Sequence, residues 1–414
     1  MRITQARHHY DIVVIGGGLV GASFACALAA QTRHCPPHIL VIEAAPSLQE
    51  STSFDARSTA LSHGSRKIYE RLGLWSGIAP HATPIQRIHV SDRGHFGAVR
   101  IDCDDMQVDA LGHVAENQHL GLVLTAALDT DPGIDFLCPA SISTLLPTPQ
   151  GMRLQVQGPW DGLLSLDAAL VVLADGGKSS VSEQLGISSS HTPYGQHALI
   201  ANVAFSDPHR HVAYERFTDS GPLAILPLAE REGAHRGALI WTLADDEAAA
   251  VAALPHQQFL DRLQERFGYR LGRFEKVGTR SLYPLTLSVA REQVRPGLVL
   301  LGNVAHSLHP VAGQGLNLAL RDAEVLAATL AQSQVLGRHP GDMAVLQTYV
   351  EQQARDQLTT ISFSDYMTRL FSSNHPALVW ARKGGLFSID LIPPFKRGFA
   401  RQAMGLAERR VQRA

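Results

Sequence analysis

Three glycines near the N-terminus have the types and the spacing of a phosphate-binding turn. Gly16, Gly18 and Gly21 stand within the sequence GGGLVG and fit the pattern G-x-G-x-x-G. The first glycine of such a turn permits its tight bend, the second lets the backbone approach a pyrophosphate, and the third allows close helix–strand contact. Glu43 follows about 20 residues later, where an acidic side chain can accept hydrogen bonds from a ribose. The pattern predicts a dinucleotide site, and the acid favours the unphosphorylated ribose of FAD or NAD.

Two later segments favour FAD. The first is the Asp-Gly turn in ADGGKS, and the second runs from a strand through GNVAHSLHPVAGQG into a helix. In the second segment an asparagine side chain can bind the ribityl chain, and glycines let backbone amides approach a flat ring. The helix that starts near Leu316 points its positive end at that ring, which stabilises negative charge on a reduced flavin. The candidate cofactor residues in the two segments are Asp175, Gly302, Asn303, Gly313, Gly315, Leu316 and Asn317.

Two histidines in the second segment, His306 and His309, could perform a different chemistry. Their spacing could place both on a metal ion, but no third ligand lies nearby in the sequence, so we predict no metal site. Either imidazole could act as a base on a substrate hydroxyl, because histidine titrates near neutral pH. We favour the interpretation that they hold the loop by hydrogen bonds, and we keep His309 as the candidate base.

Short buried strands must position these residues. Residues 11–15 and 39–42 are apolar and rich in β-branched side chains, and an alanine-rich helix is expected between them at 19–30. Similar strands are expected at 169–173 and 298–301, each followed by a glycine turn. Strands that end in glycine turns but lie far apart in the sequence indicate one nucleotide-binding domain built from separated segments.

The remaining sequence predicts a second domain inserted into the first. Residues 185–285 alternate between apolar and polar side chains and contain aromatic stretches, which is typical of antiparallel strands. We therefore predict an α/β protein with a Rossmann-like, three-layer FAD-binding domain, an inserted antiparallel-sheet substrate domain and a helical C-terminal tail. The expected bounds are 1–75, 100–184 and 286–372 for the FAD-binding domain, 76–99 and 185–285 for the substrate domain, and 373–414 for the tail.

The composition excludes several classes of protein. The net charge of −2 over 414 residues is not the basic surface that nucleic-acid binding requires, so we expect no nucleic-acid partner. The four cysteines show neither CxxC pairing nor metal spacing, which indicates reduced thiols. No apolar run approaches the roughly 18 residues of a membrane span, and the N-terminus does not read as a signal peptide. We expect a cytoplasmic protein, or one attached to the inner surface of the cytoplasmic membrane.

Longer motifs connect the chain with a known family. They are FDARSTAL at 54–61, the Asp175-Gly176 turn, AYERFT at 213–218, GPLAILPL at 221–228, the stretch 302–322 and KRGFARQAMG at 396–405. With these motifs the chain resembles the flavin-dependent aromatic hydroxylases of the p-hydroxybenzoate hydroxylase type. Within that family it is similar to the ubiquinone-biosynthesis branch of UbiH-type 2-polyprenyl-6-methoxyphenol hydroxylases. Asn303 stands where many relatives carry aspartate, and Ser182 where the wider family often has arginine.

The resemblance implies a reaction. NAD(P)H is the expected electron donor to FAD, and the reduced flavin reacts with O2 to a C4a-hydroperoxide that hydroxylates the ring of a polyprenyl phenol. The resemblance also implies that Arg57 and Pro310 lie beside the flavin, and that the strand carrying Leu223, Ile225 and Pro227 lines the substrate chamber. Two alternatives stay open: a flavin reductase or dehydrogenase acting on a prenylated substrate, and a non-catalytic FAD-bearing subunit of a biosynthetic complex.

The C-terminal segment has its own pattern. From residue 378 onward the sequence contains eight basic residues and only two acidic ones, and aromatic and aliphatic side chains are interspersed among them. Such a basic amphipathic stretch is typical of a surface that binds anionic lipid headgroups, which suits a substrate with an isoprenoid tail. The equal alternative is a helix face packed on the domain or on another ubiquinone-biosynthesis protein.

Overall fold

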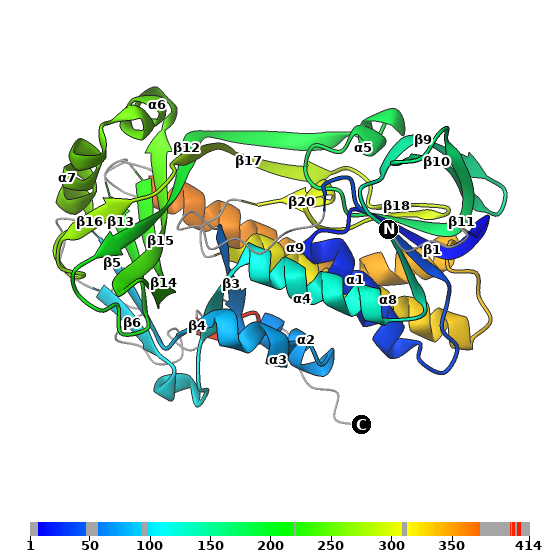
Figure 1. The fold of residues 1–414 in the computed structure, drawn as a ribbon, viewed down its shortest axis with the longest axis horizontal. Coiled ribbons are helices and arrows are strands. Elements are labelled where there is room, and N and C mark those ends of the chain that lie inside the picture. Colours follow the sequence, from blue (N-terminus) through cyan, green and yellow to red (C-terminus); the bar gives the residue numbers. More distant parts are fainter. Residues whose placement is uncertain are drawn as a thin grey trace.

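The computed structural model describes residues 7–46, 57–92, 98–218, 221–308 and 313–372, together with positions 398, 400, 401 and 404–406. Figure 1 shows two sheet-based halves side by side, with the N-terminal strand in one half and helices α6 and α7 at the far end of the other. None of the helices in these ranges combines the length and the hydropathy that crossing a bilayer requires. The predicted tail at 373–414 lies almost entirely outside the described residues.

The dinucleotide half is built on an eight-stranded sheet whose central strands are parallel. In sheet order the strands are β18 (Val294–Arg295), β19 (Leu298–Leu300), β11 (Leu164–Leu173), β1 (His9–Ile15), β2 (Ile39–Ile42) and β8 (Ile134–Leu137), and β10 (Gly151–Gln157) and β9 (Ser141–Thr148) continue from β11 as an antiparallel hairpin. The predicted strands at 11–15, 39–42, 169–173 and 298–301 are therefore adjacent in space. Segments far apart in the sequence build one sheet, as predicted.

Both faces of this sheet are covered, and alternate side chains of each strand therefore pack into two different hydrophobic cores. Ile12 and Val14 of β1 pack against helices on one face, while Val13 and Ile15 pack against the β9–β10 hairpin on the other. The covering helices are α1 (Leu19–Gln31), α4 (Asn117–Thr130), α8 (Gln314–Val335) and α9 (Met343–Ser372). Helices, sheet and hairpin form the three layers expected from the sequence.

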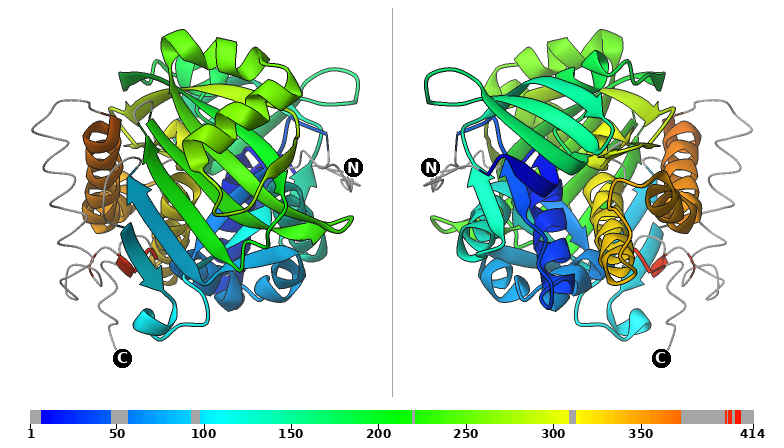
Figure 2. Two further views of the ribbon diagram at one scale, coloured as in Figure 1. Left: turned by 90° about the vertical axis from the view of Figure 1, so that its left-hand side faces the viewer. Right: turned by 90° about the vertical axis from the view of Figure 1, so that its right-hand side faces the viewer.

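The second half is a nine-stranded sheet with long antiparallel ladders. In sheet order its strands are β20 (His306–Ser307), β17 (Ser281–Ala290), β12 (Ser189–Phe205), β15 (Ala234–Ala244), β14 (Gly221–Arg231), β13 (Val212–Thr218), β5 (Arg87–Asp92) and β6 (Ala98–Asp102), with β16 (Phe274–Val277) paired to β12. Helices α6 (Asp245–Ala253) and α7 (His256–Phe267) cover its outer face, in front of the strands in the left view of Figure 2.

A small sheet and one long helix join the two halves. The three-stranded sheet consists of β3 (Ser58–Ser62), β7 (Gly112–Glu116) and β4 (Ala82–Ile85), with α2 (His63–Arg71) and α3 (Trp75–Ile78) between β3 and β4 in the chain. At the end of β7, Glu116 forms a buried ion pair of 3.1 Å with Arg236 of β15. Helix α9 runs from β18 of the dinucleotide sheet to β14 of the large sheet (Figure 1). Both connections fix the large sheet over the ends of the dinucleotide strands.

Candidate functional site

A pocket of about 350 Å³ lies at the carboxyl ends of β1, β2 and β11. Parallel strands end at the same edge of a sheet, so turns that are distant in the sequence meet there. The predicted cofactor residues that line the pocket are Gly16, Gly18, Glu43 and Asp175, with Gly176 beside them. The structure therefore brings the first two predicted cofactor segments into one cavity.

The three glycines of the G-x-G-x-x-G turn differ in backbone geometry and in what surrounds them. Gly16 adopts a left-handed φ of 103°, and a Cβ added there would lie 2.5 Å from the carbonyl oxygen of Ala174. A Cβ on Gly21 would lie 1.9 Å from the carbonyl oxygen of Gly16. By contrast, Gly18 has an ordinary extended backbone, and a Cβ there would meet no atom within 4 Å. Gly16 and Gly21 are thus required by the packing of the fold, whereas Gly18 faces open space.

That open space has the chemistry that a pyrophosphate requires. Helix α1 begins at Leu19, and Gly18 is its N-cap residue. No side chain caps this end of the helix by a hydrogen bond, and its first turn contains no acidic residue. The first N–H groups of a helix lack intrahelical acceptors, and the helix dipole favours negative charge there. The described residues therefore fit the phosphates of FAD.

Two carboxylates stand on opposite sides of the pocket. Glu43 accepts hydrogen bonds from the backbone N–H groups of Gly17 at 2.7 Å and Ala45 at 2.8 Å, which fixes its orientation. A carboxylate has further lone pairs that a ribose hydroxyl can use. Asp175 accepts a hydrogen bond of 2.7 Å from Ser179 Oγ, and burial, with a smaller contribution from Glu43, raises its pKa above the usual range.

The second predicted segment lies next to the same pocket. Gly302 adopts a left-handed φ of 74°, and Asn303 is exposed beside the Asp-Gly turn, where a Cβ added to Gly177 would meet the Cβ of Asn303 at 3.8 Å. Gly313 caps α8 in the left-handed conformation, and a Cβ on Gly315 would meet nothing within 4 Å. Among the described residues, none covers the backbone at Gly315 in the first turn of α8. Leu316 is half-buried against the helical core.

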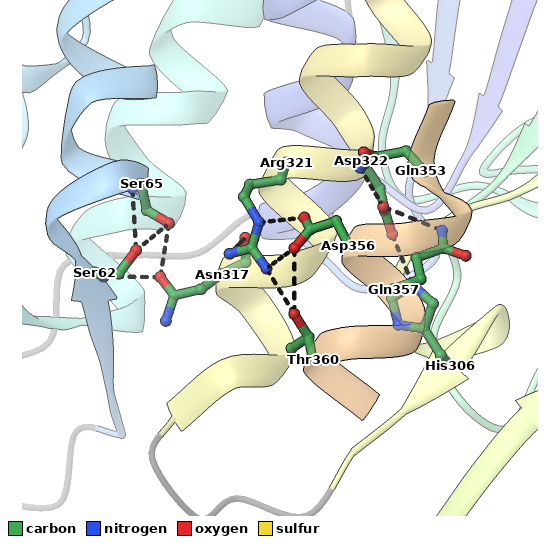
Figure 3. A network of polar contacts seen from close by, with 10 residues as sticks. All are labelled: Ser62, Ser65, His306, Asn317, Arg321, Asp322, Gln353, Asp356, Gln357 and Thr360. Atoms are coloured by element: carbon green, nitrogen blue, oxygen red, sulfur yellow. Dashed lines mark hydrogen bonds and ion pairs between the residues drawn. The ribbon is translucent and has the colours of Figure 1, made fainter. Parts of the chain in front are cut away.

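Asn317 is placed differently from the prediction. Its Oδ1 accepts hydrogen bonds from Ser62 N at 2.8 Å and Ser65 Oγ at 2.7 Å, and its Nδ2 donates to the carbonyl oxygens of Ala60 at 2.9 Å and Gly313 at 2.6 Å. Figure 3 shows the two serines on one side of this amide. Because four bonds saturate an amide side chain, Asn317 positions the Gly313 turn against β3 and has no bond left for a cofactor.

The predicted arginine, histidines and proline are placed in three different ways. Arg57 is exposed, and its Nη1 donates to the hydroxyl of Tyr283 of β17 at 3.2 Å, which links the start of β3 to the large sheet. His306 is buried, and its Nε2 lies 2.6 Å from Asp322 Oδ2 in the network of Figure 3. His309 and Pro310 lie outside the described residues.

The register of β14 corrects the predicted lining of the chamber. Leu223 and Ile225 are buried in the outer core beneath α6 and α7, and Pro227 follows them in the same alternation. The opposite side of the strand carries Ala224 and Leu226, which are half-exposed. Sequence reasoning missed this parity because both sides of the strand are apolar.

Comparisons with known proteins show which proteins the chain is similar to. The model of the family described as FAD binding domain matches residues 9–361. The ubiquinone hydroxylase UbiL of Rhodospirillum rubrum is 35% identical over 95% of this chain and 89% of that protein. The 3-demethoxyubiquinol 3-hydroxylase of Escherichia coli is 30% identical over 96% of this chain and 98% of that protein. The p-nitrophenol 4-monooxygenase PnpA of Pseudomonas putida shares the fold, with a TM-score of 0.79 at 19% identity over 98% of this chain and 100% of that chain.

Proposed function

The chain belongs to the FAD-binding-domain family of flavoprotein monooxygenases, and from that premise we propose that it hydroxylates the aromatic ring of a polyprenyl phenol in ubiquinone biosynthesis. The observation that carries this proposal is the convergence of the Gly16–Gly21 turn, Glu43 and Asp175 on one pocket, in a chain whose curated relatives are ubiquinone hydroxylases. The similarity covers nearly the whole chain, so it includes both the dinucleotide half and the large nine-stranded sheet.

The residues around the pocket support an assignment of the parts of FAD, which belongs to this proposal. We assign the pyrophosphate to the amino end of α1 at Gly18, the ribose to Glu43, and the ribityl chain and the ring to Asn303 and the start of α8 at Gly315. Bound FAD, once reduced, reacts with O2 and supplies the oxygen atom. The protein binds the phenol, orients its ring and keeps water away, tasks for which the apolar inner face of the large sheet is suited.

Three further features belong to the proposal. NAD(P)H is the electron donor that the family resemblance implies. The basic, aromatic segment after residue 378 attaches the protein to the inner face of the cytoplasmic membrane or to other ubiquinone-biosynthesis proteins. Either attachment would bring the site to a substrate whose isoprenoid tail lies in the bilayer.

Quinone profiling of a deletion strain tests the function. The proposal expects loss of ubiquinone and accumulation of a precursor that lacks one ring hydroxyl group, with recovery on re-expression of the intact gene. Unchanged quinones would overturn the pathway assignment. Purified protein then separates the alternatives: a monooxygenase consumes O2 with NAD(P)H and a prenylated phenol, a dehydrogenase or reductase turns over without O2, and a non-catalytic subunit binds FAD without turnover.

A further inference from the structure

Arginine side chains gather on the outer face of the large sheet, at the end of the molecule away from the dinucleotide strands (Figure 1). Cross-strand pairing puts Ile225 beside Tyr214, Tyr214 beside His89, and His89 beside Arg100. Ile225 belongs to the core beneath α6 and α7, and residues paired across strands point to the same face. The row that ends at Arg100 therefore lies on the outer face of β13, β5 and β6.

Two more arginines of these strands point to the same face. Arg216 pairs with Leu223, which is buried in the outer core. Arg87 stands two positions before His89 on β5, and alternate residues of a strand share a face about 7 Å apart. The core beneath α6 and α7 takes described residues from β12, β14, β15 and β16, and none from β5 or β6. This edge of the outer face is therefore left to polar side chains.

Two loops bring further arginines to this edge. The ring of Phe267, at the end of α7, lies 5.6 Å from that of Tyr214, and Arg270 follows three residues later. Arg210 lies in the turn just before β13. The charges of both arginines act on Tyr214, where they oppose the rise in pKa that burial causes. The arginine patch then consists of Arg87, Arg100, Arg210, Arg216 and Arg270.

The acids that border the patch leave much of its charge unbalanced. Asp102 of β6 is bound to Arg87 at 2.8 Å. Asp207, in the turn before β13, accepts a hydrogen bond of 3.1 Å from the hydroxyl of Ser206. Within the described ranges, three exposed members of the patch have no ion pair: Arg100, Arg210 and Arg270.

His89 lies among these charges with an unused nitrogen. Its side chain is buried, and among the described residues its Nε2 has no hydrogen-bond partner. Burial, together with the charges of Arg270, Arg100 and Arg216, lowers the pKa of His89 to about 4, so the ring is uncharged at neutral pH. A neutral imidazole can donate one N–H, and buried polar atoms rarely stay without a partner. Nε2 can therefore donate to an oxygen atom of a ligand.

The chemistry of the patch selects an anion with several oxygens. Guanidinium groups bind phosphate through pairs of parallel hydrogen bonds, and their charge is permanent. A phosphate group directs its oxygens towards the corners of a tetrahedron, whereas a carboxylate has two oxygens in one plane. Guanidinium groups that arrive from three strands and two loops match the first shape better. The phosphates of FAD are assigned to Gly18 in the other half, so this ligand is a second one.

We propose that the arginine patch binds a phosphate group of a ligand other than FAD, with His89 Nε2 donating to one of its oxygens. The inference does not depend on the reaction proposed above. Two sources carry such a group: the headgroup of an anionic phospholipid and a soluble phosphate compound. The recognition chemistry is the same for both, and the experiment separates them.

Three variants of the full-length, FAD-loaded protein test the site. The double variant Arg100→Gln/Arg270→Gln removes two charges of the patch that have no ion pair. Arg33→Gln/Arg338→Gln removes the same charge from exposed positions in the dinucleotide half and is the matched control. His89→Phe keeps an aromatic ring against Tyr214 but removes the donor, and it leaves the net charge unchanged because His89 is neutral. Thermal midpoint and FAD content show whether each variant is folded.

Two probes separate the sources of the phosphate group. Inorganic pyrophosphate, measured by isothermal titration, represents a soluble compound. Sedimentation with phosphatidylcholine vesicles, with and without phosphatidylglycerol, represents the headgroup. We expect the wild type and the control to bind one of the two probes. The affinity should fall by about tenfold or more in Arg100→Gln/Arg270→Gln and by about tenfold in His89→Phe, since each loses hydrogen bonds to a charged group.

The outcomes divide clearly. Binding of pyrophosphate that depends on the patch supports a soluble ligand, and binding to phosphatidylglycerol vesicles that depends on the patch supports a headgroup. A wild type that binds neither probe overturns the inference. Equal affinities of Arg100→Gln/Arg270→Gln and Arg33→Gln/Arg338→Gln also overturn it, because another surface would then bind the anion. Wild-type affinity in His89→Phe would overturn the assignment of Nε2.

Discussion

His306 Nε2 of β20 lies 2.6 Å from Asp322 Oδ2 of α8, and both side chains are buried. The other oxygen of Asp322 accepts hydrogen bonds from Gln353 at 2.6 Å and Gln357 at 3.1 Å, both on α9 (Figure 3). One carboxylate thereby joins a strand of the large sheet to the two long helices of the dinucleotide half. His306 is thus a residue that holds the segment in place, the interpretation favoured from the sequence.

Replacing Asp322 should separate these elements. Asp322→Ala leaves an imidazole N–H and two amides without their buried acceptor, and we expect a loss of about 3–5 kcal/mol in the free energy of unfolding. Asp322→Asn should lose only about 1–2 kcal/mol, because its oxygen can still accept from the glutamines and His306 can change its tautomer to accept from the new amide. Urea unfolding measures both, and equal losses would contradict the network.

Asn317 permits a similar test at the other end of α8. Asn317→Ala removes the partner of one backbone N–H and two carbonyl groups at once, and we expect a loss of about 2–4 kcal/mol in unfolding free energy, with weaker FAD binding because the Gly313 turn loosens. Isothermal titration of the FAD-free protein with FAD measures the affinity. Full stability of the alanine variant would show that these bonds are not needed. Ser65→Ala, which removes the hydroxyl donor and leaves the bond from the Ser62 N–H, is the milder control.

The parts of this protein that could be predicted from its sequence are those in which a local pattern has one physical meaning. The Gly16–Gly21 turn is such a case, since a buried strand, a glycine turn and an apolar helix follow one another without interruption. The buried strand of residues 164–173 could be located for the same reason, although its start could not. Its first half alternates apolar and polar side chains and pairs with β10, a ladder that a search for a continuous apolar run does not show.

Features that depend on distant partners could not be predicted. Leu223 and Ala224 are both apolar, and only the presence of α6 and α7 on one side decides which of them faces the chamber. Asp322 lies 16 residues after His306, on helix α8, so the spacing of the two histidines did not reveal this acid. Asn317 has the sequence context of a cofactor ligand, yet its amide is consumed by bonds to β3 and α2.

The different geometry of the fingerprint glycines predicts different failures. Gly18→Val adds its side chain to an extended backbone and to open space, so we expect a folded protein with the wild-type thermal midpoint but without FAD. Gly21→Val forces a side chain into the backbone of Gly16 and should give little folded protein. Flavin absorbance and circular dichroism of the purified variants measure the two properties. A yellow Gly18→Val protein would show that the pyrophosphate does not lie at this turn.

The raised pKa of Glu215 also predicts how stability depends on pH. In the unfolded chain a glutamate titrates near 4.3, whereas burial raises the pKa of Glu215 to about 7 in the folded protein. Below both values the carboxyl group is protonated in either state and has no effect on stability. As pH rises above about 4.5, the unfolded chain ionises first, so folding loses stability until the folded group also ionises near pH 7.

Glu215→Gln removes this loss, because an amide does not ionise. We expect the variant and the wild type to be equally stable near pH 4.5, and the variant to be more stable by about 1–2 kcal/mol at pH 8, a value reduced from the full shift because the side chain is partly exposed. Unfolding in urea across this pH range measures the difference, and Glu275→Gln, at an exposed position, should show no such trend. A stability difference between Glu215→Gln and the wild type that stays constant from pH 4.5 to 8 would mean that burial does not raise the pKa of Glu215 in the folded protein.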